Sequence, residues 1–129
     1  MAREIKIIEY GIIDSTNLQA RRLVEGAEGN EIQPTVLIAK GQTAGRGRLG
    51  RSFYSPTDMG LYTSLIIESP TELDKLISLT ALAAVAASEA IEAAFGIRVG
   101  IKWVNDLYYN ERKVAGILAE SCVKKKKRY

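Results

Sequence analysis

The sequence predicts an α+β fold, in which a mixed and largely antiparallel β-sheet carries its helices on one face. Short, apolar, β-branched segments follow one another along the chain instead of alternating strictly with helices. Two other segments have the pattern of helices. The 129 residues are 47% hydrophobic and 26% charged, which fits one globular domain or part of one.

The first half of the chain is predicted to hold three strands and one helix. Each predicted strand is apolar and rich in β-branched residues. These strands are expected over residues 5–13, 35–40 and 61–68. Residues 14–17 (Asp-Ser-Thr-Asn) all favour a helix N-cap, so a short helix is expected over residues 18–25, ended by Gly26. Residues 41–60 contain five glycines and three arginines without an apolar period, which predicts a long functional loop.

The second half is predicted to begin with a helix and to continue as a meander of strands. Ser69, Pro70 and Glu72 are typical of a helix start, and the helix is expected to run to Phe95 and end at Gly96. Three strands are predicted after this helix, and a hairpin turn joins the second of them to the third. The strands are expected over residues 98–103, 107–109 and 114–123, and the turn over residues 110–112.

Composition excludes several classes of site. The chain has no histidine, so Ser-His-Asp triads, Cys-His pairs and histidine zinc sites are excluded. Cys122 is the single cysteine, which excludes an internal disulfide and fits a reducing, cytoplasmic location. The longest apolar run, residues 77–95, is interrupted by serine, threonine and glutamate, so neither a membrane span nor a membrane partner is expected.

Basic residues gather in two places. Residues 124–128 hold five of the eighteen basic residues, and the rest of the chain is mildly acidic although the net charge is +3. Arg46, Arg48 and Arg51 form the second cluster. On the residues alone, this cluster is either a basic surface loop or an anion cradle of backbone amides and guanidinium groups. Residues 45–50 match G-x-G-x-x-G, but no helical pattern follows, which argues against a dinucleotide site.

Three blocks of sequence together resemble the signature blocks of biotin protein ligases. They are residues 45–51 (GRGRLGR), 102–106 (KWVND) and 113–120 (KVAGILAE), with Ser15-Thr16-Asn17 and Gln42-Thr43-Ala44 upstream in matching order. The resemblance extends over nearly the whole chain. It implies the catalytic core of biotin and lipoate ligases, which is similar to that of class II aminoacyl-tRNA synthetases, in incomplete form.

The resemblance also implies an activity and its partners. Such ligases join biotin to ATP as biotinoyl-5′-AMP, with Mg²⁺ accompanying ATP. They then pass the acyl group to a lysine of the biotin carboxyl carrier protein of acetyl-CoA carboxylase or a related carboxylase. The biotin carboxylate is itself the nucleophile, so the enzyme mainly aligns two anions and compensates their charge.

Individual residues receive roles through the same resemblance. The biotin site would comprise Ser15, Thr16, Asn17, Gln42, Gly45, Arg46, Lys102 and Gly116. The ATP or adenylate site would comprise Arg48, Arg51, Phe53, Asn105 and Asp106. Catalytic roles would fall to Lys102, Arg46 and Arg48. No metal ligands are assigned.

Several of these residues have a structural alternative. Residues 15–17 also suit helix capping, Lys102 also suits a solvated strand, and residues 105–106 also suit a turn. Lys113 is either a hairpin charge or part of the site. The chain departs from the family pattern at two positions, where Phe53 replaces the usual Trp and Val104 replaces the usual Pro.

The resemblance further implies that residues 1–129 are part of a catalytic domain, without an N-terminal DNA-binding domain or a C-terminal barrel domain. Sequence-specific DNA binding is therefore not expected. An exposed strand edge after residues 114–123 would favour a homodimer and leave this chain a poor ligase by itself. The alternatives are a non-catalytic biotin or biotinoyl-adenylate-binding module, a lipoate ligase and a nucleic-acid-binding protein. Lipoate ligases resemble one another through a block that contains histidine, which is absent here.

Overall fold

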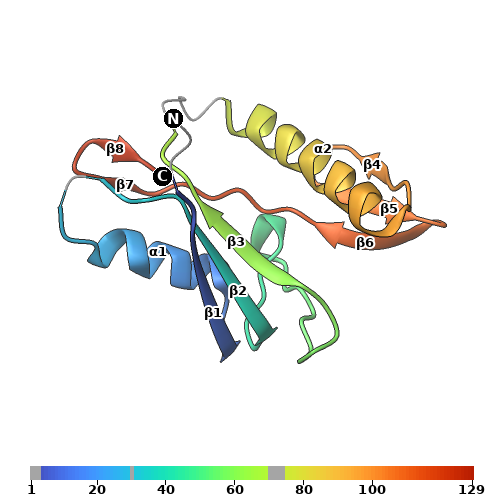
Figure 1. The fold of residues 1–129 in the computed structure, drawn as a ribbon, viewed down its shortest axis with the longest axis horizontal. Helices are drawn as coiled ribbons and strands as arrows, with labels where there is room; N and C mark the ends of the chain where they lie inside the picture. The colour runs from blue at the N-terminus through green and yellow to red at the C-terminus, as the bar shows by residue number, and fades with distance from the viewer. Residues whose placement is uncertain (1–3, 30, 70–74) are drawn as a thin grey trace. The chain divides into compact units, whose positions relative to one another are not determined.

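The computed structural model describes residues 4–29, 31–69 and 75–129. The chain divides into two compact units (Figure 1). The first unit combines Met1–Pro70 with Glu120–Tyr129, and the second comprises Thr71–Ala119.

The first unit contains a three-stranded mixed sheet in the order β1-β2-β3. The strands are β1 (Lys6–Ile13), β2 (Thr35–Gln42) and β3 (Tyr62–Ile66). β2 is parallel to β1 and antiparallel to β3. A parallel pair needs a crossover connection, and helix α1 (Thr16–Gly26) supplies it (Figure 1). The predicted α+β class is confirmed, and α1 begins two residues earlier than predicted.

The core of the first unit lies between α1 and one face of this sheet. Residues of β2 alternate between buried and more exposed, as expected for a strand covered on one side. Leu37 of β2 is fully buried and clusters with Val24 of α1 and Ile66 of β3. Ser64 pairs with Leu37 in register and is also buried, so a polar side chain reaches the same covered face.

The last residues of the chain form a tight hairpin instead of a continued strand. The predicted strand over residues 114–123 is wrong as a single element, because only β6 (Arg112–Gly116) and β7 (Val123–Lys124) lie within or beside it. β7 pairs with β8 (Lys127–Arg128), and Lys125 and Lys126 turn the chain with φ angles of 48° and 66°. Residues 117–122 are half-buried, and partial burial does not require a ladder of strand hydrogen bonds.

The lysines of this hairpin bind the C-terminal end of α1. The Lys124 ammonium donates to the carbonyl oxygens of Glu25, at 2.8 Å, and Ala27. Lys125 donates to the Gly29 carbonyl at 3.0 Å. A helix C-terminus carries unpaired carbonyls and a partial negative charge, so the Lys124 ammonium caps α1, whereas Lys125 binds the chain just beyond it. The basic segment is thus part of the fold, which argues against its use for nucleic-acid binding.

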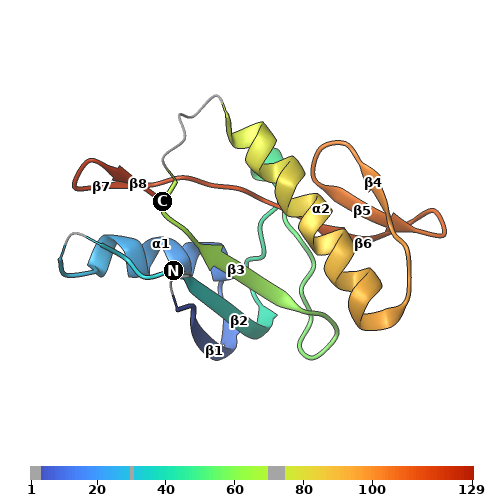
Figure 2. The ribbon, with the colours of Figure 1, turned by 45° about the horizontal axis from the view of Figure 1, so that its top comes forward.

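The second unit contains helix α2 (Leu76–Phe95) and an antiparallel sheet in the order β4-β5-β6 (Figure 2). β4 spans Gly100–Lys102 and β5 spans Asp106–Tyr109, and α2 packs against both strands. α2 ends at Gly96, as predicted, because Gly96 adopts the left-handed conformation of a C-cap with φ 66°. The predicted start signal of this helix includes residues 70–72, which lie outside the described residues.

One helix tests the expectation that the chain has no membrane span. Within the described residues, Ile77–Phe95 of α2 is long and apolar enough to cross a bilayer by length and composition, with a mean hydropathy of 1.4. The interrupting polar residues therefore do not exclude a span on these grounds. A single such helix is weak evidence for a membrane, because core helices of soluble proteins meet the same criterion.

Candidate functional site

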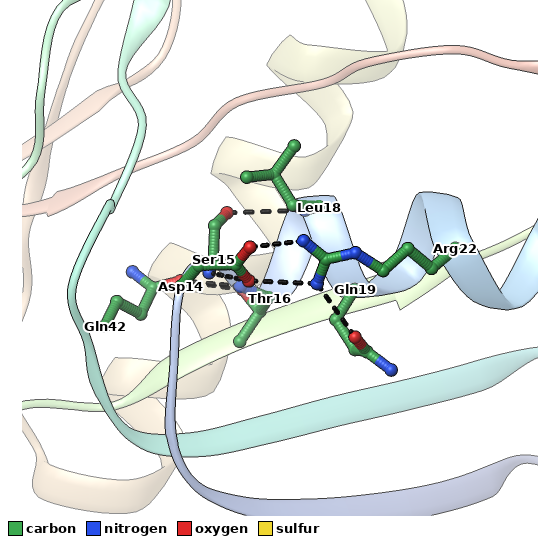
Figure 3. A network of polar contacts seen from close by, with 7 residues as sticks. All are labelled: Asp14, Ser15, Thr16, Leu18, Gln19, Arg22 and Gln42. Atoms are coloured by element: carbon green, nitrogen blue, oxygen red, sulfur yellow. Dashed lines mark hydrogen bonds and ion pairs between the residues drawn. The ribbon is translucent and has the colours of Figure 1, made fainter.

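The start of α1 is held by a network of hydrogen bonds and one ion pair (Figure 3). Ser15 is the N-cap, and its Oγ accepts a hydrogen bond from the backbone N–H of Leu18 at 3.4 Å. The Asp14 carboxylate accepts from the Ser15 N–H at 2.7 Å and pairs with both terminal nitrogens of Arg22. Hydrogen bonds from Arg22 and from the Ser15 N–H hold the pKa of Asp14 at about 2. The predicted capping role of Ser15 is confirmed.

Gln42, at the end of β2, connects this helix start to the loop that follows β2. Its Oε1 accepts from the Thr16 backbone N–H at 2.8 Å and from the Thr16 hydroxyl at 3.2 Å (Figure 3). Its Nε2 donates to the Ser55 hydroxyl at 3.0 Å, and Ser55 is buried. Both ends of the amide are engaged, so the orientation of Gln42 is fixed. The strand end, the helix start and the returning loop therefore meet at one side chain.

Asn17 lies at the next position of α1 and contacts two further elements. Its Oδ1 is hydrogen-bonded to the hydroxyl of Ser64 on β3, which also lies 2.7 Å from Oγ1 of Thr16. Its Nδ2 donates to Oε2 of Glu120 at 3.0 Å. The other carboxylate oxygen of Glu120 pairs with Nη2 of Arg46 at 3.2 Å. One network therefore joins α1, β3, the C-terminal segment and the arginine-containing loop.

The loop that holds the arginines is a small closed ribbon. Gly47 donates to the Arg51 carbonyl at 2.7 Å, and Phe53 donates to the Gly45 carbonyl at 2.8 Å. A single 3₁₀ turn, Arg48–Gly50, closes its tip. No helix opens after the glycines, which agrees with the argument against a dinucleotide site.

Gly45 has a clear steric role in this ribbon. A Cβ atom at Gly45 would lie 2.4 Å from the Phe53 carbonyl oxygen and 2.5 Å from the Ser55 hydroxyl. The strand before the loop and the segment after it can approach this closely only because residue 45 has no side chain. Arg48 and Arg51 are exposed, so they lie accessible on the surface of the ribbon.

Three of the four predicted site residues of the second unit lie in one row across its sheet, and the fourth, Asn105, lies in the turn between β4 and β5. Lys102 pairs in register with Asp106, and Asp106 pairs with Gly116. The Lys102 ammonium lies 5.3 Å from the centre of the Tyr108 ring, and the Lys113 ammonium lies 2.8 Å from the Asp106 carboxylate. Lys102, Asp106 and Gly116 therefore lie together within their own unit. Lys113 is an ion-pair partner of a predicted site residue.

The first unit likewise brings together six predicted residues: Ser15, Thr16, Asn17, Gln42, Gly45 and Arg46. Three members of the network were not assigned a role from the sequence. Ser55 and Ser64 are buried serines, and no local pattern distinguishes them from other small polar residues. Glu120 is the last residue of the signature block 113–120, and this position is the sequence feature that could have identified it as a site residue.

The described residues do not form a cluster of side chains that could bind Mg²⁺ by themselves. Among the residues that the structure describes, no group of three or more histidine, cysteine, aspartate or glutamate side chains comes together to hold a metal ion. The one acidic side chain predicted near the nucleotide, Asp106, is paired with Lys113.

The fold is that of the catalytic domain of biotin protein ligases. It superposes on the biotin protein ligase from Aquifex aeolicus in complex with biotin and ATP, with a TM-score of 0.73, 37% identity, and coverage of 95% of this chain and 49% of that one. Residues 12–129 match the model of the biotin/lipoate A/B protein ligase family. The chain belongs to this family.

The chain is also similar to curated biotin ligases. It is 43% identical to the bifunctional ligase/repressor BirA of Bacillus spizizenii over 114 residues, covering 88% of this chain and 34% of the relative. It is 37% identical to the biotin–[acetyl-CoA-carboxylase] ligase of Paracoccus denitrificans over 110 residues, covering 84% of this chain and 44% of the relative. The chain therefore spans between a third and a half of the length of these relatives.

Proposed function

We propose that this chain forms the biotin- and ATP-binding part of a cytoplasmic biotin protein ligase. The reaction is the formation of biotinoyl-5′-AMP and transfer of the biotinoyl group to a lysine of a biotin carboxyl carrier protein. The observation that carries this proposal is the network from Ser15 to Arg46, in a chain that belongs to the biotin/lipoate ligase family. The names of the relatives, and the biotin and ATP bound in the Aquifex aeolicus ligase, support the same choice.

The polarity of the network favours biotin over lipoate. Biotin carries a ureido ring with two N–H donors and one carbonyl acceptor, and lipoate carries a dithiolane ring without either. Thr16, Gln42 and Ser55 offer hydroxyl and amide groups in a largely buried setting. These groups hydrogen-bond to one another, and a ureido ring can exchange bonds with them whereas a dithiolane ring can only break them. Arg46 supplies the positive charge that the carboxylate of either acid would need.

The proposed first step joins two anions without a covalent enzyme intermediate. A carboxylate oxygen of biotin attacks the α-phosphorus of ATP, the bond to the bridging oxygen breaks, and pyrophosphate leaves with its electron pair. Two unit charges 4 Å apart interact by about 4 kcal/mol at an effective dielectric of 20, so repulsion is the main obstacle. Arg46, Arg48 and Lys102 are the cations proposed to offset it. Mg²⁺ would enter with the ATP phosphates.

The second step is an acyl transfer. The amine of a carrier lysine attacks the carbonyl carbon of the mixed anhydride, AMP leaves, and the amine loses a proton. The attacking nucleophile belongs to the carrier protein, so the chain needs no serine or cysteine nucleophile. This agrees with the absence of histidine from the sequence.

Binding and turnover of the 129-residue chain test the proposal. Calorimetry should show biotin binding and much weaker lipoate binding. Addition of ATP and Mg²⁺ should release pyrophosphate with biotin, slowly because the chain is expected to be a poor ligase by itself. Gln42→Leu should weaken biotin binding strongly, whereas Gln33→Leu, at an exposed glutamine before β2, should not. Biotin binding without pyrophosphate release would favour the non-catalytic binding module. Equal or tighter lipoate binding would reject biotin as the substrate.

A further inference from the structure

We propose that Glu120 is a positioning residue of the biotin site, which fixes the amide of Asn17 and the guanidinium of Arg46 at the same time. This inference rests on the proposed function. The two residues that it would position come from different elements, the first turn of α1 and the loop after β2. Glu120 itself comes from the C-terminal segment of the same unit.

The two carboxylate oxygens of Glu120 have separate partners. Oε2 accepts from Nδ2 of Asn17 at 3.0 Å, and Oε1 pairs with Nη2 of Arg46 at 3.2 Å. The Glu120 side chain is 25% exposed and that of Arg46 is 42% exposed. The pair is therefore partly shielded, and the outer part of the guanidinium stays accessible to a ligand.

Glu120 also determines which way the Asn17 amide points. Ser64 binds the amide oxygen from one side and Glu120 accepts from the amide nitrogen on the other. An amide rotated by 180° would set its oxygen against the Glu120 carboxylate, two acceptors facing each other. The carboxylate thus holds one of two orientations of a side chain proposed to contact the ureido ring.

The same carboxylate links the two ends of the proposed biotin site. Asn17 lies at the neutral end and Arg46 at the end that would receive the biotin carboxylate. Side chains held in place before the ligand arrives lose less conformational entropy on binding. Loss of the Glu120 charge should therefore weaken biotin binding, because Arg46 and the Asn17 amide would both become mobile.

If Glu120 blocked Arg46 instead of positioning it, loss of its charge would have the opposite effect on biotin affinity. If Glu120 merely occupied Arg46 until the ligand displaced it, removal of its charge would release the guanidinium and tighten biotin binding. Glu120→Gln separates these roles with little change of shape, because its amide keeps one acceptor oxygen and places a donor against the second partner. We expect about tenfold weaker biotin binding, as for the loss of a hydrogen bond to a charged group.

Calorimetry of the 129-residue chain with two ligands tests this role. Biotin is compared with biotinol, in which a hydroxymethyl group replaces the carboxyl group. Glu120→Gln should weaken biotin binding more than biotinol binding, because only biotin engages the charge of Arg46. In an Arg46→Gln background, Glu120→Gln should no longer change the ratio of the two affinities. A merely structural loss would weaken both ligands equally in both backgrounds.

The control is Glu92→Gln, which removes another ion-paired carboxylate, 2.8 Å from Arg98 in the second unit, and should leave both affinities unchanged. Unchanged or tighter biotin binding by Glu120→Gln, or an equal loss for both ligands, would overturn the positioning role. If Glu120→Gln fails to fold, Glu120→Asp keeps the charge on a shorter side chain and should show the same preferential loss for biotin. Absence of biotin binding by the unmodified chain would instead reject the proposed function.

Discussion

Substitution of Gly45 by alanine should disrupt the site through steric overlap alone. The added Cβ would lie 2.4 Å from the Phe53 carbonyl oxygen, whereas ordinary van der Waals contacts of Cβ atoms begin at 3.4 Å. The segment that contains Phe53 would have to withdraw by about 1 Å to restore ordinary contact. Backbone cannot yield as easily as the end of a flexible side chain, and the Ser55 hydroxyl blocks a second direction at 2.5 Å.

The cost of this overlap can be worked from the contacts of the loop. Overpacking of a well-packed region costs about 1–3 kcal/mol. The displaced segment also holds the Phe53 N–H to Gly45 carbonyl bond of 2.8 Å and the Gln42 N–H to Ser55 carbonyl bond of 3.0 Å. Weakening these two bonds adds about 1 kcal/mol. We expect a loss of about 2–4 kcal/mol in the free energy of unfolding, or roughly 10 °C in melting temperature.

Gly47→Ala is the matched control, because both glycines lie in the same ribbon. A Cβ at Gly47 would meet nothing closer than the Arg51 carbonyl oxygen at 3.5 Å. Thermal unfolding of the two variants by circular dichroism, followed by biotin titration, provides the comparison. Gly45→Ala should unfold at a clearly lower temperature and bind biotin weakly. Equal melting temperatures for the two variants would refute the steric reasoning.

Three further predictions concern other parts of the structure. Lys124→Ala should lower the free energy of unfolding by about 1 kcal/mol in denaturant titrations, since it removes the cation that caps α1, and Lys126→Ala should change it less. The pKa of Asp14 is lowered from 3.8 to about 2, so its pairing with Arg22 stabilises the fold above pH 4 and is lost as the pH falls toward 2. The difference in stability between the unmodified chain and Arg22→Gln should therefore shrink over that interval and stay constant above it. Lys102→Ala should slow single-turnover adenylate formation by at least about tenfold with an unchanged melting temperature, and a normal rate would end its proposed role.

Local patterns predicted most of the fold. The apolar, β-branched residues of β2, the Ser15 cap and the helix stop at Gly96 each depend on a few neighbouring residues, so sequence alone located them. The turn between β5 and β6 is similar, because Asn110 and Glu111 adopt the positive φ angles of a tight hairpin. Such features are fixed by the conformational preferences of the chain itself.

Contacts between distant residues could not be predicted in this way. Glu120 pairs with Arg46 and Asn17 across more than seventy residues of sequence, and nothing local to Glu120 indicates either partner. The uniform composition of residues 124–128 indicated no partner for these side chains, whereas their structure depends on carbonyl groups near Glu25 and on Glu68. Composition indicates what a side chain can bind, and the fold decides whether a partner lies within reach.

The network of the first unit changes character along its length, and this change is the strongest structural argument for the proposed ligand. At one end, Thr16, Gln42 and Ser55 are joined by hydrogen bonds between neutral groups. At the other end, Arg46 and Glu120 form an ion pair. A ligand with a neutral hydrogen-bonding head and a carboxylate tail would match both ends, and biotin has this arrangement. A fully charged ligand would place charge against the neutral end, where the buried groups offer no counter-ion. A neutral ligand would make no use of the exposed, positively charged part of the Arg46 guanidinium.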